Sequence, residues 1–86
     1  MKTDLIKDLL NFLEEKETAS KVEVDEKTVI MGENSTLDSI NSVEFILDLE
    51  DKYQVSLMDL VVEMVQDKKF VDLFSLDKMI DSLRSK

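Results

Sequence analysis

Apolar side chains recur at helical spacing in four separate stretches of the chain. The first stretch places them at Leu5, Ile6, Leu9, Leu10, Phe12 and Leu13. The last places them at Leu76, Met79, Ile80 and Leu83. Positions i, i+3, i+4 and i+7 share one face of an α-helix. Both stretches therefore predict amphipathic helices, the first ending near Thr18 and the last beginning at a Ser75 cap.

Two more helices are expected in the middle of the chain. One runs from about Ser39 to Lys52, with Asp38 as a good N-cap because its carboxylate can accept from free backbone N–H groups. The next begins near Ser56, with Asp59 three residues on as a short capping box. Its expected buried face consists of Leu57, Leu60, Val61, Met64 and Val65.

The segment between the first two helices has no sustained helical period. Val29, Ile30 and Met31 form a small apolar plug before Gly32, and residues 33–36 are typical of a turn. The plug indicates that this long connection lies against the core. With no proline and a single glycine, the chain favours helices. We expect a single domain over residues 1–86, with an all-α, four-helix bundle and a long loop between the first two helices.

The helix predicted over 39–52 carries two apolar arcs at roughly 100° per residue. Phe45, Ile46 and Leu49 form the first arc. Ile40, Val43 and Leu47 form the second, beside the acidic residues Glu44, Asp48 and Asp51. One arc is enough for a small bundle. The second is therefore either additional core or an exposed contact surface rimmed by acids.

The net charge of the chain limits the classes of partner that we expect it to bind. Asp and Glu number 20 against 11 Lys and Arg, for a net charge of -9. Such a surface repels nucleic acid and anionic membranes and attracts proteins with basic patches. The sequence shows neither a signal peptide nor an apolar stretch long enough to span a membrane. We expect a cytoplasmic protein with no nucleic-acid partner.

The chain lacks the residues that most catalytic and zinc sites require, since it has no histidine and no cysteine. Its acids are not spaced as a calcium loop, which leaves a small metal-binding protein as a weaker hypothesis. Ser39, directly after Asp38, has two interpretations. It is either an ordinary helix-start serine or a site of covalent attachment through its hydroxyl, near the positive end of the helix dipole.

The segment from Leu37 to Glu50, Leu-Asp-Ser-Ile-Asn-Ser-Val-Glu-Phe-Ile-Leu-Asp-Leu-Glu, resembles the attachment motif and recognition helix of the acyl carrier and peptidyl carrier protein family. The strong similarity continues to Leu57 and includes Tyr53 and Val55. Weaker similarity extends over nearly the whole chain, at Thr28, Ile30, Gly32, Ser75, Leu76, Ile80 and Leu83. Some residues depart from the family pattern. Leu37 stands where many members have alanine or glycine, and Ile40 stands where leucine or methionine is usual. The stretch over residues 58–73 is longer than in the common fatty-acid carrier. These departures favour a specialised member.

The resemblance implies a non-catalytic carrier in fatty acid biosynthesis or a related lipid or polyketide pathway. Ser39 would carry a 4'-phosphopantetheine arm, added from coenzyme A by a phosphopantetheinyl transferase, and the arm's thiol would hold acyl groups as thioesters. Partner enzymes with basic patches would contact Asp38, Glu44, Asp48 and Asp51, with Ile40, Val43 and Leu47 as the apolar part of the contact. We expect a monomer. An aminoacyl or peptidyl carrier and an unmodified acidic helical interaction module remain the alternatives.

Overall fold

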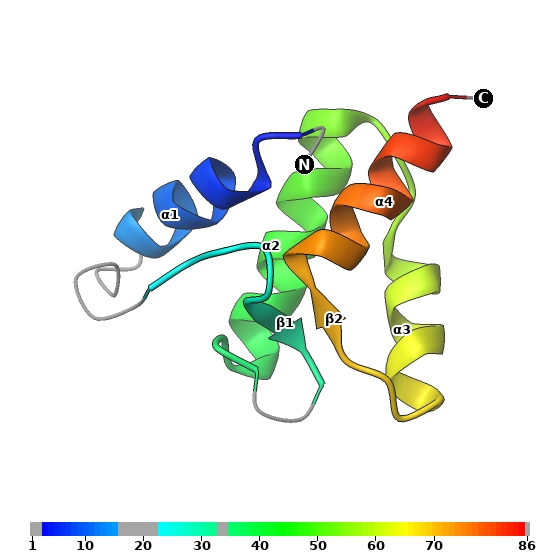
Figure 1. Cartoon of the computed structure of the whole chain (residues 1–86), viewed down its shortest axis with the longest axis horizontal. Helices are drawn as coiled ribbons and strands as arrows, with labels where there is room; N and C mark the ends of the chain where they lie inside the picture. The colour runs from blue at the N-terminus through cyan, green and yellow to red at the C-terminus, as the bar shows by residue number, and fades with distance from the viewer. Residues whose placement is uncertain (1–2, 16–22, 33–34, 86) are drawn as a thin grey trace.

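The computed structural model describes residues 3–15, 23–32 and 35–85, and within them the chain is mostly helical. Figure 1 shows the order of its elements. They are α1 (Leu5–Glu15), β1 (Val29–Met31), α2 (Ser39–Tyr53), α3 (Met58–Gln66), β2 (Val71–Asp72) and α4 (Leu73–Arg84). The four helices match the four predicted stretches. The expected extension of the first helix to Thr18 lies outside the described residues.

A short two-stranded sheet accompanies the helices. The described part of the chain is therefore not purely α-helical, although the sequence predicted an all-α fold. β1 and β2 pair antiparallel, with Val29 opposite Asp72 and Met31 opposite Val71 (Figure 1). The pairing continues where the Leu73 N–H donates to the Thr28 carbonyl at 3.1 Å. These bonds fasten the long first connection to the start of α4. Ile30 is fully buried, which confirms that this connection lies against the core.

The core contains the apolar faces of all four described helices and of β1. On α2 the first predicted arc is buried, and Phe45 packs against Phe12 of α1 with ring centroids 5.4 Å apart. α3 is less embedded than its sequence suggests. Val61 is buried, but Leu60, which we expected in the core, is 40% exposed. α3 therefore buries a narrower stripe than its apolar content predicts.

The helix starts follow the predictions at α2 and differ at α3 and α4. Asp38 caps α2 as expected, its Oδ1 accepting from the Asn41 N–H at 2.7 Å. α4 begins at Leu73, before Ser75, because the Asp72 carboxylate accepts from the Ser75 N–H at 2.8 Å. The predicted Ser75 cap is therefore wrong.

At α3 the predicted Ser56 cap is replaced by a side chain of the preceding helix. The Glu50 Oε2 accepts from the N–H groups of Leu57 and Met58, at 2.6 and 2.8 Å. The free N–H groups of a helix start need such a partner. This one carboxylate thus joins the end of α2 to the start of α3.

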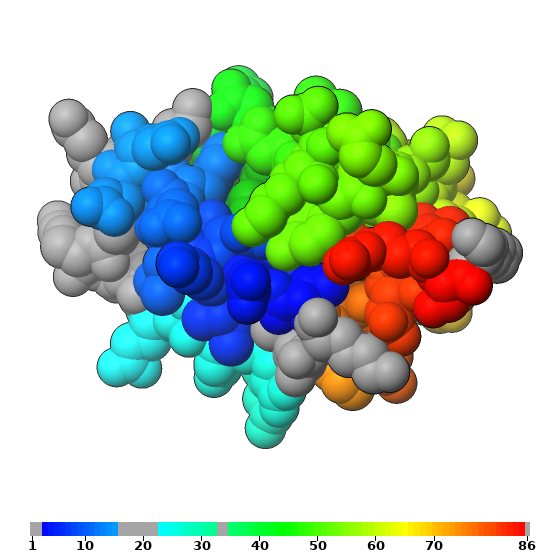
Figure 2. All heavy atoms as spheres, turned by 90° about the horizontal axis from the view of Figure 1, so that it is seen from above, coloured from blue at the N-terminus to red at the C-terminus, as the bar shows by residue number. Residues whose placement is uncertain are grey.

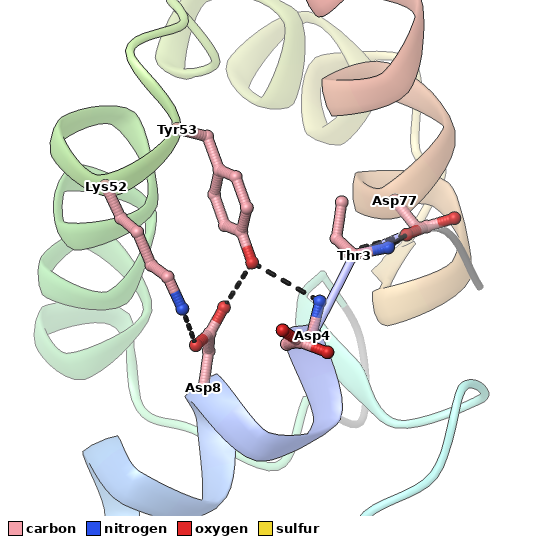
Figure 3. Close-up of polar contacts among 6 residues, drawn as sticks. All are labelled: Thr3, Asp4, Asp8, Lys52, Tyr53 and Asp77. Carbon is pink, nitrogen blue, oxygen red and sulfur yellow. Dashed lines mark hydrogen bonds and ion pairs between the residues drawn. The ribbon is translucent and has the colours of Figure 1, made fainter.

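Polar contacts join α1 to α2, and the residues just before α1 to α4, at one end of the molecule (Figure 3). The Tyr53 hydroxyl donates to Asp8 at 2.6 Å, Lys52 forms an ion pair with the same carboxylate, and Asp77 accepts from both the N–H and the hydroxyl of Thr3. Figure 2 shows the beginning of α1, the end of α2 and the end of α4 side by side on this surface. None of the described helices has the length and apolar character that a membrane crossing requires.

Candidate functional site

Ser39 is exposed at the first position of α2. The residues around it are fixed by local bonds. Leu37 is buried in the core, and the Thr36 N–H donates to the Val29 carbonyl at 2.8 Å. On the other side, the buried Ser42 hydroxyl donates to the carbonyl of Ile30. The first turn of α2 is therefore held on β1, and the Ser39 side chain lies where another molecule can reach it.

A groove of about 760 Å³ begins beside Ser39. Its walls come from the end of β1, the first turns of α2, the end of α3 and the connection from α3 to β2, segments that lie at the lower end of the molecule in Figure 1. The groove is lined by Met31, Gly32, Ser35, Ser39, Ser42, Val43, Val65, Lys68, Lys69 and Phe70. It is large enough for a flexible chain. Its apolar lining is contributed by several elements: Met31 of β1, Val43 of α2, Val65 of α3 and Phe70 of the connection to β2.

The connection from α3 to β2 is held in a defined shape. Lys68 has a positive φ of 60°, its N–H donates to the Val65 carbonyl at 3.0 Å, and the Lys69 N–H donates to the Met64 carbonyl at 2.9 Å. Gly32 allows this connection to approach β1, because a Cβ on Gly32 would lie 3.0 Å from the Phe70 Cα. The two lysines thus reach the groove from a built turn that packs against the end of β1.

The second apolar arc of α2 is exposed, so it is not additional core. Ile40 is 72% exposed, Leu47 50% and Val43 39%. Glu44, Asp48 and Asp51 continue the same face, since residues three, four, seven and eleven apart share one side of a helix. We call these six residues the α2 contact face. Asp38 is also exposed, but its carboxylate is engaged in capping the helix.

Two described residues with shifted pKa values, Lys52 and Tyr53, lie away from Ser39. The hydrogen bond to Asp8 raises the pKa of the Lys52 ammonium. Burial, followed by the hydrogen bond to Asp8, raises the pKa of the Tyr53 hydroxyl. Both residues stand at the last turn of α2, whereas Ser39 stands at its first. These shifts therefore mark a structural contact between α1 and α2.

The chemistry available at Ser39 is that of an accessible hydroxyl. Within the described residues, its side chain forms no hydrogen bond, and these residues contain no cluster of three or more side chains suited to a metal ion. A phosphate ester at this position would lie near the positive end of the α2 dipole. The open groove beside it can accommodate a chain attached through that ester, so the residues present fit a phosphate-linked tether.

Sequence reasoning proposed Ser39 and the α2 contact face as site residues but missed the groove. Phe70, Met31 and Val65 meet there only because β1 and β2 pair. The adjacent lysines at 68 and 69 were the one available signal, as an unusual positive doublet in an acidic chain.

Comparisons with known proteins assign no family to this chain. No protein-family model matches it, and the comparisons with curated proteins and with solved structures found no match.

Proposed function

We propose that this protein is a carrier whose Ser39 bears a 4'-phosphopantetheine arm, and that it presents acyl groups to partner enzymes without catalysing their reactions. The observation that carries the proposal is the exposed Ser39 hydroxyl, at the start of α2 and on the wall of an open groove. The arm, when attached, supplies a thiol on which acyl groups are held as thioesters. An aminoacyl or peptidyl cargo is the alternative within the same mechanism.

The attachment step makes Ser39 the acceptor of a phosphoryl group. Its Oγ forms a bond to the phosphorus that bears pantetheine in coenzyme A, the bond from that phosphorus to adenosine 3',5'-bisphosphate breaks, and the serine proton passes to a base on the transferase. The chain itself has no histidine or cysteine for this work. A separate enzyme must therefore reach the hydroxyl, and the exposure of residues 38–40 gives it access.

The α2 contact face supplies the features that transient docking requires. Ile40, Val43 and Leu47 expose apolar area, and Glu44, Asp48 and Asp51 lie beside them. Apolar contact gives an enzyme something to bury, while the surrounding charge steers the encounter with a basic patch. Because this face begins at Ile40, directly after Ser39, an enzyme docked on it is also placed next to the arm.

Mass spectrometry of the intact protein tests the proposal. After incubation with coenzyme A and a phosphopantetheinyl transferase, we expect the mass to increase by one 4'-phosphopantetheine group. Ser39→Ala should abolish the increase, and Ser56→Ala, at another exposed serine, should leave it unchanged. Failure of several transferases to label the folded protein would contradict the proposal and favour an unmodified interaction module that uses the same face of α2.

A further inference from the structure

The groove beside Ser39 differs in charge from the rest of the protein. The chain has 20 acidic and 11 basic residues, yet none of the described residues that line this groove is acidic. Its charged side chains are Lys68 and Lys69, both exposed. A positive groove in a strongly acidic protein attracts anions that the remaining surface repels.

The two lysines are not engaged elsewhere in the described part of the chain. Neither forms an ion pair or a side-chain hydrogen bond with another described residue. Lys52, by contrast, pairs with Asp8, and Lys78 lies over the Phe74 ring at 4.6 Å. The ammonium groups of Lys68 and Lys69 are therefore available to a ligand in the groove.

The placement of the lysines relative to Ser39 suggests what that ligand is. The first turn of α2 and the connection from α3 to β2 contribute to the same groove beside the end of β1 (Figure 1). The apolar side chains of Val43, Val65 and Phe70 line it together with them. A molecule attached at Ser39 can lie on these apolar residues and place an anionic group beside the lysines.

We infer that Lys68 and Lys69 form a cationic subsite that binds an anionic group of the molecule attached to Ser39. The inference rests on the proposed carrier function. The anion has two sources, which share this chemistry: the phosphodiester that joins the arm to the serine, or a carboxylate at the far end of a dicarboxylic acyl cargo. Exposed ion pairs are individually weak, so the subsite restrains the tethered molecule while leaving it free to be withdrawn by a partner enzyme.

Binding of free ligands to the unmodified protein tests the subsite without relying on attachment. The probes are 4'-phosphopantetheine, neutral pantetheine and succinyl-pantetheine, and the readout is the shift of backbone amide resonances. We expect at least one anionic probe to shift Lys68, Lys69 and Phe70, and neutral pantetheine to shift them less. Lys68→Gln with Lys69→Gln should weaken anion binding roughly fivefold to tenfold. The arginine pair at these positions should retain it, and the control pair Lys7→Gln with Lys27→Gln should not change it.

The modified protein distinguishes the two sources of the anion, the phosphodiester of the arm and the carboxylate of the cargo. A transferase can load the arm from butyryl-coenzyme A or succinyl-coenzyme A, whose four-carbon cargoes end in a methyl group and a carboxylate, respectively. If the cargo carboxylate is bound, the succinyl form alone shifts Lys68 and Lys69, and added salt removes the shift. If the phosphodiester is bound, both forms shift these residues equally, as does the arm without cargo.

The inference fails if neutralising Lys68 and Lys69 changes ligand shifts no more than the control pair, in both the free-ligand and the attached forms. That outcome is distinct from failure of the proposed function. Should Ser39 resist every transferase while 4'-phosphopantetheine still binds at the lysines, the carrier function would fall, and Lys68 and Lys69 would remain an anion site with no attached molecule to hold.

Discussion

Single residues determine whether the groove beside Ser39 can form. Ser42 is buried, and its hydroxyl binds the Ile30 carbonyl, so α2 cannot turn about its axis without losing that bond. Gly32 has a φ of 115°, which side-chain-bearing residues rarely adopt, and it lies against Phe70. These two residues fix the end of β1 between α2 and the turn that carries Lys68 and Lys69.

Gly32→Ala should lower the free energy of unfolding by about 2–3 kcal/mol, because alanine is strained at positive φ and its Cβ meets the Phe70 backbone. Urea denaturation measures this change, with Ser56→Ala as the control at an exposed site. The amide resonances of Lys69 and Phe70 should move in the same variant. A loss smaller than about 0.5 kcal/mol, the range of ordinary surface changes, would mean that the two segments separate easily.

At the scale of helices and strands, the structure shows which parts of the fold could be predicted from the sequence. The helices were predictable because each carries a local 3.6-residue period, and Asp38 was recognisable as a cap because it bonds a residue three positions on. The strands were not predictable. They are very short, and their pairing joins Val29 to Asp72, far along the chain. Glu50 as the cap of α3 was missed because its side chain reaches across a break between helices.

The candidate site follows the same division between local and distant contacts. Ser39 and the acids of α2 belong to one continuous segment, and their spacing alone places them on one face. The groove requires β1, α2, α3 and the turn before β2 to meet, which no single window of sequence reveals. The exposure of Leu60 was misjudged because α3 packs with a narrower stripe than its apolar residues offer.

The α2 contact face gives a prediction at the scale of one helix. Reversing charge at Glu44 and Asp48 to lysine should slow loading by a transferase about tenfold at low salt, because the altered charges would repel a basic patch. The matched variant, Glu14→Lys with Glu15→Lys on α1, changes net charge equally at exposed positions. Loading rates at low and high salt measure the effect. Equal slowing by both pairs would show that α2 is not the contact face.

Across the whole molecule, contacts at the end away from Ser39 hold the helices together. Tyr53 is at the centre of them, since its hydroxyl binds Asp8 and its ring lies 5.5 Å from the Arg84 guanidinium (Figure 3 shows the Asp8 contact). These bonds link α1, α2 and α4 independently of the β1–β2 pair. The molecule is thus fastened at both ends of α2.

Alkaline pH should weaken this end. Burial and Asp8 raise the Tyr53 pKa, and Asp8 raises the Lys52 pKa, so both groups keep their protons to higher pH in the folded state. The stability that these two protonated groups give the folded state is complete below their ordinary pKa values. It is lost as the pH rises through the pKa values of the folded protein. Unfolding free energy should therefore fall above pH ~10.

Because Tyr53 is the single tyrosine, the near-ultraviolet absorbance of the phenolate reports its titration directly. The folded protein should titrate at higher pH than the chain in urea, and Asp8→Asn should narrow the difference. Coincident titration curves for the folded and unfolded chain would contradict the assigned contact.

The two ends of the described part of the chain have a practical consequence. The start of α1 and the end of α4 both lie at the end of the molecule opposite β1 and the first turn of α2 (Figure 1). An affinity tag, a fused protein or a link to a solid support, added at either end, therefore leaves the serine and its groove uncovered. Immobilised protein should be suitable for capturing whichever enzymes visit that surface.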